Sequence, residues 1–319
     1  MAITRSNLIA DVISNIGTDI WNIVGLSSHI IILSQTCKEM KRAVYNELHV
    51  PRYAMIIVRP SRLHHVAHDL TLTHVKITDE VNLNIGRDIF QALSCLSNII
   101  RLDVSELQNR TMDIDVLAFC RGLGQYCPAL EHLRLSALFL HAFIDGKGGA
   151  SWMSLLYKLR VLDLRNMDIP TEVGHEILVA CNSSMNLEEI NLSDNNLHYL
   201  YEILSDEGSL YIKTLKLDFN GFGSVNGIGY FLDEDENENE NEIEHDVIGL
   251  RDLFKDYTSL TSLSLTSNAF TNTEGFTIAE YLNTNTNLTF LDLSYNFIDN
   301  HIRQHIRDAW HGEPDKLKL

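Results

Sequence analysis

Three neighbouring histidines are the residues of this chain whose types and spacing come nearest to a metal-binding motif. His64, His65 and His68 form an HHxxH, in which His64 and His68 would share one face of a helix. Zinc sites in proteins need three or four side-chain ligands. The segment contains no cysteine, and nothing at a typical ligand spacing completes a set. We therefore expect no metal at this motif.

The glycines and cysteines also lack the surroundings that catalysis would need. Gly146-Lys147-Gly148-Gly149 has none of the remaining parts of a nucleotide-binding loop, and no G-x-S-x-G occurs. The five cysteines form no C-x-x-C pair, and no secretory signal opens the sequence, which indicates free thiols in a reducing compartment. We expect no enzymatic activity, no cofactor, and a cytoplasmic or nuclear location.

The charge of the chain argues against some partners. Its 25 Lys and Arg against 43 Asp and Glu give a net charge of −18. Nucleic-acid binding begins with neutralisation of phosphates by Lys and Arg, so we expect no nucleic-acid partner. No apolar run approaches the roughly 20 residues that span a bilayer, so we expect no membrane association either.

A repeat organises most of the sequence. Apolar residues recur at positions 1, 4, 6, 9 and 11 of a short segment, and in the later copies position nine is Asn. Leu187–Leu197 and Leu288–Ile298 follow LxxLxLxxNxL almost literally. A shared period and a fixed Asn together indicate one structural unit used again and again. The eight copies begin at Ala67, Ile99, Leu130, Leu159, Leu187, Ile212, Leu260 and Leu288.

Between these segments the apolar spacing becomes helical. Thr171–Cys181, Asn272–Leu282 and Asp299–Trp310 each place apolar residues on one face, and Thr171 can cap its helix. Each repeat is therefore predicted to be a short strand, a turn and a helix. A unit of this kind cannot bury its apolar face alone and must stack on its neighbours.

These residues resemble the leucine-rich-repeat family, in its ribonuclease-inhibitor-like form. The resemblance implies an α/β fold over residues 67–312: a right-handed solenoid with a concave parallel sheet and convex helices. Positions 1, 4, 6 and 11 would point inward, and the position-nine Asn would hydrogen-bond backbone groups in the turn. The first four copies carry Val75, Leu107, Leu138 and Met167 there, so their turns must be satisfied differently.

Residues 1–48 do not follow the repeat and are predicted to form short helices. The stretch from Ile16 to Met40, with Leu33-Ser34-Gln35-Thr36-Cys37-Lys38 near its end, resembles an F-box, although Ile16-Gly17 replaces the family's Leu-Pro. A plain helical cap on the solenoid is the alternative. An F-box implies docking on a Skp-type adaptor through part of an apolar set: Ile20, Ile23, Val24, Leu26, Ile30 and Leu33.

The segments at either side of the solenoid receive simpler predictions. Residues 49–66 link the two parts, and the apolar stretch Ala54–Val58 is predicted to be a short strand that covers the edge of the first repeat. Residues 313–319 are expected to be a tail.

The side chains between the apolar strand positions would lie on the concave face. This face is mixed in charge and carries possible aromatic anchors. A merely solvated sheet face is the alternative, and we favour a target-binding surface because solenoids present this side to partners. The candidate residues are Asp103, Arg134, Asp163, Arg165, Asn191, Lys216, Asp218, Phe219, Phe290, Asp292 and Tyr295.

An acidic insertion interrupts the sixth repeat at residues 224–246. It contains nine acids and no Lys or Arg between Asp233 and Asp246. Such a run repels itself and buries little apolar area, so disorder is predicted. It is either a tolerated expansion or a site for a basic partner.

Together these features favour a monomeric protein-binding module over an enzyme. The F-box resemblance implies a substrate receptor of an SCF-type cullin ubiquitin ligase, with a Skp-type adaptor and a protein target as partners. The alternatives are an adaptor-free scaffold or inhibitor and, ranked last, a regulator of a small GTPase.

Overall fold

The computed structural model describes residues 56–58, 74–78, 98–106, 116–137, 157–182, 184, 186–204, 211–223, 239–285 and 287–319. The F-box-like segment, its predicted adaptor-binding residues, the HHxxH motif and residues 146–149 lie outside these ranges. Predictions about them therefore stay predictions.

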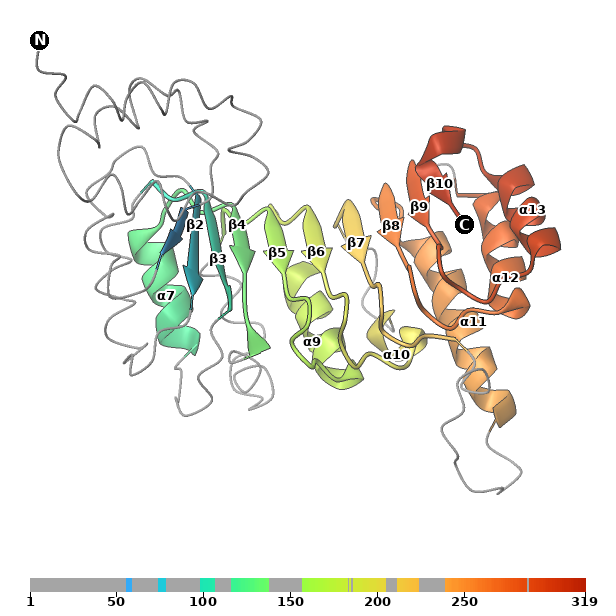
Figure 1. Ribbon diagram of the computed structural model, residues 1–319, viewed down its shortest axis with the longest axis horizontal. Helices are drawn as coiled ribbons and strands as arrows, with labels where there is room; N and C mark the ends of the chain where they lie inside the picture. Colours follow the sequence, from blue (N-terminus) through green and yellow to red (C-terminus); the bar gives the residue numbers. More distant parts are fainter. Residues whose placement is uncertain are drawn as a thin grey trace, which may run out of the picture.

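The described strands form one parallel sheet of ten strands in sequence order, β1 to β10 (Figure 1). Every strand pairs with the one before it and the one after it in the chain. The bounds are Ile56–Val58 (β1), His74–Thr78 (β2), Arg101–Glu106 (β3), His132–Arg134 (β4), Val161–Asp163 (β5), Glu189–Asn191 (β6), Thr214–Lys216 (β7), Ser262–Ser264 (β8), Phe290–Asp292 (β9) and Leu317–Lys318 (β10).

The described helices all lie on the same side of this sheet (Figure 1). α10, α11, α12 and α13 pack on one another in chain order, and α9 packs on α10. With consecutive parallel strands on one side and helices on the other, the fold is a leucine-rich-repeat-like α/β solenoid. The helices are Val116–Tyr126 (α7), Thr171–Asn182 (α9), Leu200–Leu204 (α10), Asn239–Asp256 (α11), Asn272–Leu282 (α12) and Asn300–Ala309 (α13), followed by a 3-10 turn at Pro314–Lys316.

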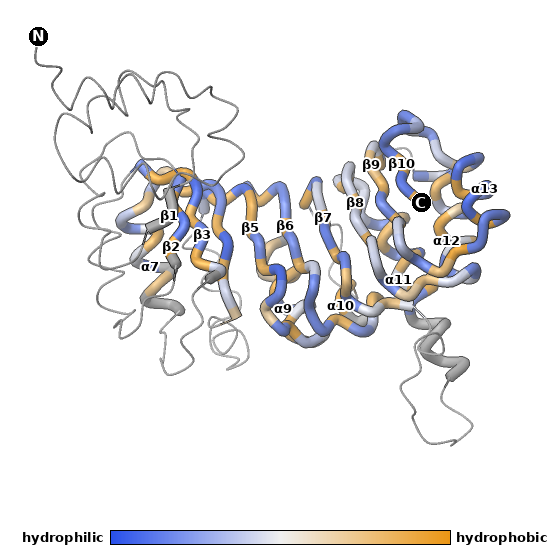
Figure 2. Tube along the Cα trace, viewed as in Figure 1, coloured by the Kyte–Doolittle hydropathy of each residue, from blue (hydrophilic) through white to orange (hydrophobic). Residues whose placement is uncertain are grey.

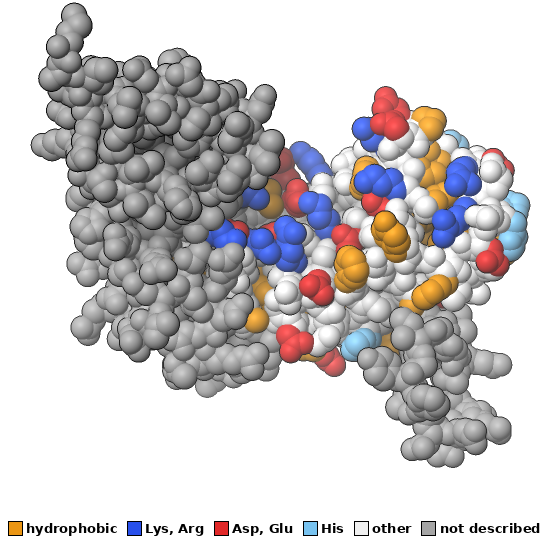
Figure 3. Space-filling view, in the orientation of Figure 1, with side chains coloured by type: hydrophobic (Ala, Val, Ile, Leu, Met, Phe, Trp, Pro, Cys, Tyr) orange, Lys and Arg blue, Asp and Glu red, His pale blue; other side chains and the backbone are white. Residues whose placement is uncertain are grey.

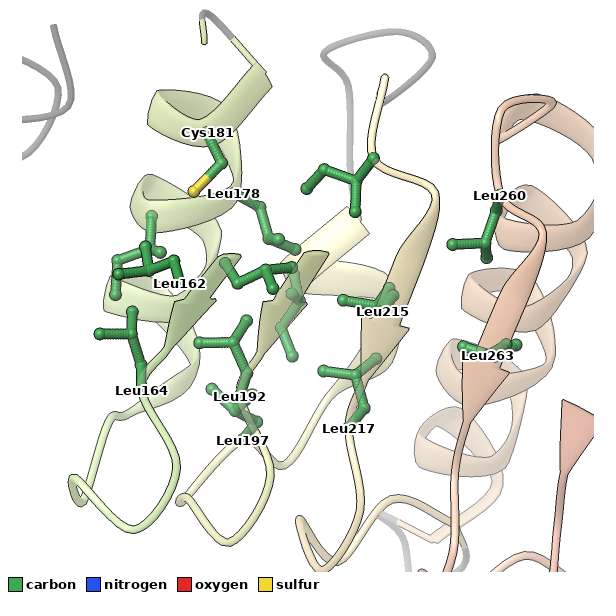
Figure 4. Close-up of a cluster of buried hydrophobic side chains, with 14 of the residues drawn as sticks. Leu162, Leu164, Leu178, Cys181, Leu192, Leu197, Leu215, Leu217, Leu260 and Leu263 are labelled. Atoms are coloured by element: carbon green, nitrogen blue, oxygen red, sulfur yellow. The ribbon is translucent and has the colours of Figure 1, made fainter. Parts of the chain in front are cut away.

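The core runs between the two layers along the whole solenoid. Side chains alternate between the faces of a strand, so positions four and six of each repeat point toward the helices. The pairs Leu162/Leu164 and Leu215/Leu217 are fully buried there, as the close-up shows (Figure 4). Hydrophobic stretches accordingly continue from strand to strand across the molecule (Figure 2). The predicted inward positions are confirmed for these repeats.

The asparagines at position nine hold the turns, as predicted. Oδ1 of Asn268 accepts from the N–H groups of Asn220 (3.0 Å) and Phe222 (3.4 Å), and its Nδ2 donates to the carbonyls of Leu217 and Leu265. Each of these side-chain amides therefore hydrogen-bonds backbone groups of the preceding repeat as well as of its own. The repeat that has Met167 at this position borrows the side chain of Asn195, which accepts from the Met167 N–H at 3.0 Å.

The predicted register of the first repeat is wrong. Val75 was assigned to the turn, but it lies in β2 and pairs with Leu102, which occupies position four of the next repeat. The strand therefore comes five residues later than expected, because a degenerate apolar pattern fits more than one frame. The strand predicted within Ala54–Val58 is confirmed, since β1 pairs with β2 through Ile56 and Val75.

The prediction of disorder at 224–246 is wrong for residues 239–246, which form the first turns of α11. The helix is anchored by Leu250 and Leu253 in the core and by the buried carboxylate of Asp246. Oδ1 and Oδ2 of Asp246 accept from the N–H groups of Leu200 (3.0 Å) and Gly223 (2.7 Å). Residues 224–238 lie outside the described ranges. The predicted tail likewise supplies an edge strand, β10.

Candidate protein-binding surface

The sheet face opposite the described helices, called here the strand face, carries the predicted target-binding residues. Strand pairing places position five of neighbouring repeats side by side, which brings Arg134 next to Asp103 and Asp163 and Lys216 next to Asn191. Figure 3 shows charged and hydrophobic side chains gathered on this side. The predicted grouping on one face is confirmed, whereas target binding by that group stays a prediction.

An ion-pair chain crosses three strands of this face. Arg134 lies between Asp103 (Nη1 to Oδ2, 3.7 Å) and Asp163 (Nε to Oδ2, 3.6 Å). Arg165 contacts the same Asp163 at 2.6 Å, and this hydrogen bond raises the pKa of Arg165. Both aspartates are buried, whereas the side chains of Arg134 and Arg165 are 31% and 45% exposed, so the aspartates hold two cations at the surface of the strand face.

The Asp and Asn residues at position five also accept hydrogen bonds from their own backbone. Asp103, Asp163, Asn191 and Asp292 each accept a hydrogen bond from the N–H group two residues later, at 2.9 to 3.2 Å. This local turn motif gives Asp and Asn a structural reason to occur at position five. Their presence alone therefore does not identify a contact with a target.

The C-terminal half of the face is linked in the same way by residues that the sequence pattern did not single out. Lys216 contacts Glu189 at 2.5 Å. Lys318 contacts Asp292 at 3.2 Å, and its Nζ lies 5.1 Å from the centre of the Phe290 ring. Glu189 lies at position three, which also points to the strand face, and Lys318 lies in the unexpected β10. Because side chains alternate along a strand, the sequence pattern could have identified Glu189. It could not have identified Lys318.

Asp218 joins three strands of the surface. Its Oδ1 accepts from the Ser264 hydroxyl at 2.6 Å and from the Thr266 N–H at 2.8 Å, and its Oδ2 accepts from the Ser193 hydroxyl at 3.3 Å. The carboxylate is therefore fixed from both neighbouring repeats.

A basic row occupies position three at the N-terminal end of the face. The register aligns His74, Arg101 and His132 on β2, β3 and β4. Partial burial, and after it the charge of Arg101, lowers the pKa of both histidines. His74 was missed because the predicted frame put β2 five residues too early, and Arg101 and His132 were missed because the predicted surface took its strand residues mainly from position five.

The turn that follows each strand has a left-handed residue at position eight. Asn166, Asp194, Phe219, Ser267 and Tyr295 have φ between 55° and 60°. Two of them, Phe219 and Tyr295, were predicted as aromatic anchors, and both rings are exposed, by 59% and 82%.

The described residues offer little support for other kinds of site. Among them, no group of three or more His, Cys, Asp or Glu side chains is placed to hold a metal ion. No helix of the described part is long and apolar enough to cross a membrane. Cys127 and Cys181 are free and buried, and burial raises the pKa of the Cys127 thiol to about 12. These two thiols are therefore poor nucleophiles.

Comparisons with known proteins give only distant likenesses. No family model matches the chain, and no curated protein matches it. A Caenorhabditis elegans tropomodulin C-terminal domain is 13% identical, with 53% of this chain and 90% of that one covered and a TM-score of 0.36. Two Listeria monocytogenes internalins are each 16% identical: InlF (79% and 69% covered, TM-score 0.34) and InlC2 (70% and 69%, 0.36). No function follows from these values.

Proposed function

We propose that this chain is a protein-binding module that holds its target on the strand face. The observation that carries the proposal is the row of ion pairs in which Arg134 lies 3.7 Å from Asp103 and 3.6 Å from Asp163, so that three strands present charged side chains next to one another. A surface whose side chains are already ordered loses less conformational entropy when a partner binds. The same face also presents the exposed rings of Phe219 and Tyr295, and tyrosine is among the residue types that often dominate binding energy.

The finer proposal is a substrate receptor of an SCF-type cullin ubiquitin ligase, in which residues 16–40 dock a Skp-type adaptor. Its support is the F-box resemblance of the sequence and the order of that segment before the repeats. The strand face would then hold the protein to be ubiquitinated.

A pull-down with a purified Skp-type adaptor tests this role. Three forms are compared: the full chain, a chain lacking residues 1–46, and a full chain carrying Ile23→Asp and Leu33→Asp. Adaptor binding by the full chain alone is expected. Failure of the full chain to bind would refute the receptor role and leave the protein-binding module standing.

An adaptor-free scaffold or inhibitor is the second candidate. It is favoured by the ion pairs that the described residues form, which lie between Asp103 and Lys318. This candidate predicts that the chain lacking residues 1–46 still binds its target.

The target surface is tested by a matched pair of charge reversals. A photoreactive residue at position 216 captures candidate targets, and each is then titrated as a purified protein. Lys216→Glu on the strand face should weaken binding at least tenfold, because it also repels the neighbouring Glu189. Lys255→Glu makes the same change on the exposed surface of α11 and should have no effect. Equal effects of the two variants would contradict a strand-face site.

A further inference from the structure

Two aromatic residues hold a backbone conformation that does not suit them. Phe219 (φ 57°) and Tyr295 (φ 60°) occupy the left-handed position that the equivalent turns fill with Asn166, Asp194 and Ser267. Short polar residues tolerate this region because they hydrogen-bond locally, whereas bulky side chains there are uncommon. The local fold therefore gives no reason for a ring at either position.

Packing gives no reason either. The two rings are 59% and 82% exposed, among the most exposed large hydrophobic side chains in the described part of the chain. A costly conformation combined with little burial is a combination found more often at binding sites than in scaffolds.

The backbone fixes the spacing of the two rings. Phe219 donates its N–H to the Thr266 carbonyl at 3.0 Å, and Ser267 donates to the Ser294 carbonyl at 2.9 Å, so the three turns stack in order. Parallel strands lie roughly 4.8 Å apart, which puts the attachment points of the rings about 10 Å from each other. The small side chain of Ser267 lies between them. Two rings that project from points this far apart leave room for one planar cation between them, and a cation is attracted to an aromatic face over about 6 Å.

The turns around the two rings contribute acidic side chains. Arg303 of α13 also reaches this region, where its guanidinium donates to the carbonyls of Ile298 and Asn296. Positions seven to ten of β6 to β9 comprise Ser193–Asn196, Asp218–Gly221, Thr266–Ala269 and Ser294–Phe297. These sixteen residues include two acids, Asp194 and Asp218, and no Lys, Arg or His. Asp194 is exposed in the turn next to Phe219. Figure 3 shows hydrophobic and acidic side chains near one another over this part of the strand face.

We propose that Phe219, Ser267 and Tyr295, called here the aromatic ledge, form a subsite for an arginine side chain of a protein target. The guanidinium would lie over Ser267 between the two rings and face the carboxylate of Asp218, which accepts from the N–H of the neighbouring Thr266 at 2.8 Å. Arginine fits better than lysine because its planar group stacks on aromatic faces and is less strongly hydrated. This proposal rests on the proposed function, and it adds that the bound target presents an arginine side chain.

Fluorescence anisotropy with a labelled Gly-Arg-Gly-Arg-Gly peptide tests the ledge without any target. Phe219→Asn with Tyr295→Asn removes both rings and restores a residue type that suits the backbone. The double variant should bind the peptide about tenfold more weakly, and its Tm should equal or exceed that of the parent chain. Asn166→Ser, in the same turn row but outside the ledge, should change binding less than twofold. Asp218→Asn, which removes the charge and keeps an oxygen that accepts hydrogen bonds, should weaken binding severalfold.

Two results would overturn the proposal. One is unchanged peptide affinity in the double variant, which would mean that only the acidic residues between Asp233 and Asp246 attract the peptide. The other is a Tm lowered by several degrees, which would mean that the rings stabilise the fold. The single variant Tyr295→Asn provides the same test if the double variant does not fold. Because no target enters this assay, its outcome is independent of the Lys216→Glu comparison that tests the proposed function.

Discussion

The asparagines at position nine show how a single residue type maintains this solenoid. Asn195, Asn220, Asn268 and Asn296 are buried, and each accepts from backbone N–H groups of the preceding repeat while donating to backbone carbonyls. Without them these buried backbone groups would have no partner, which is costly in a core that excludes water. Position nine therefore has a structural role, whereas positions three and five of each repeat remain available for binding.

Replacement of Asn268 by alanine tests this role. The change leaves the N–H groups of Asn220 and Phe222 and the carbonyls of Leu217 and Leu265 without their side-chain partner. We expect a loss of about 2–4 kcal/mol in the free energy of unfolding, measured by urea denaturation. Asn287→Ala, at an exposed site, serves as control and should cost less than about 0.5 kcal/mol. Similar costs for the two variants would contradict the role.

The half-buried His132 makes the stability of the fold depend on pH, and the direction of this dependence can be predicted. Partial burial and the nearby charge of Arg101 lower its pKa in the folded state, while Glu131 and Glu189 oppose the shift only in part. The unfolded chain therefore binds a proton more readily, and stability falls as the pH drops below about 6.5. His132→Gln should flatten this fall in denaturation curves taken between pH 7.5 and 5. An unchanged slope would show that His132 does not contribute.

At the scale of elements, α11 stabilises structure well beyond its own repeat. α10 has five residues, too few to be stable alone, and the carboxylate of Asp246 on α11 receives the N–H of its first residue, Leu200. The same carboxylate receives the N–H of Gly223 after β7. The C-terminal residues act similarly on β9, where Leu293 donates its N–H to the Lys318 carbonyl at 2.8 Å.

Asp246→Ala tests the link between α10, α11 and the segment after β7. Two hydrogen bonds to a buried carboxylate disappear, and an expected cost of about 2–4 kcal/mol follows from charge-assisted bonds of this kind. Asp256→Ala, at the exposed C-terminal end of the same helix, is the matched control and should be nearly neutral. The measurement is urea denaturation followed by circular dichroism, and equal midpoints for the two variants would refute the link.

At the scale of the whole molecule, the solenoid is a chain of neighbours. Each described strand pairs only with its predecessor and its successor, and the helices pack in the same order. In such an architecture stability is close to a sum of repeat terms and nearest-neighbour interface terms. A local defect should therefore be felt locally.

Hydrogen exchange can measure how far a defect spreads. Asn268→Ala should speed amide exchange in β7 and β8, whose turns share its hydrogen bonds, and leave β3 and β4 at parent rates. The parent chain under the same conditions is the reference. Faster exchange throughout the sheet would instead mean that the solenoid unfolds as one cooperative unit.

The sequence by itself determined the repeat, its inward leucines and the buried asparagines. Leu215, Leu217 and Asn220 could be placed from spacing alone, because a strand alternates its side chains and a tight turn needs a polar group that reaches the backbone. The strand face follows from the same alternation, which is why spacing alone correctly groups Asp103, Arg134 and Asp163 on it.

Tertiary structure decided what that local periodicity leaves open. The frame of β2 depended on its pairing with β3, because Val75 and Ile77 satisfy more than one apolar register. The helix at 239–246 depended on Asp246 finding backbone donors 46 and 23 residues away along the chain. The bridge from Arg134 to Asp103 and Asp163, and the left-handed turns beneath Phe219 and Tyr295, likewise arise only where neighbouring repeats stack.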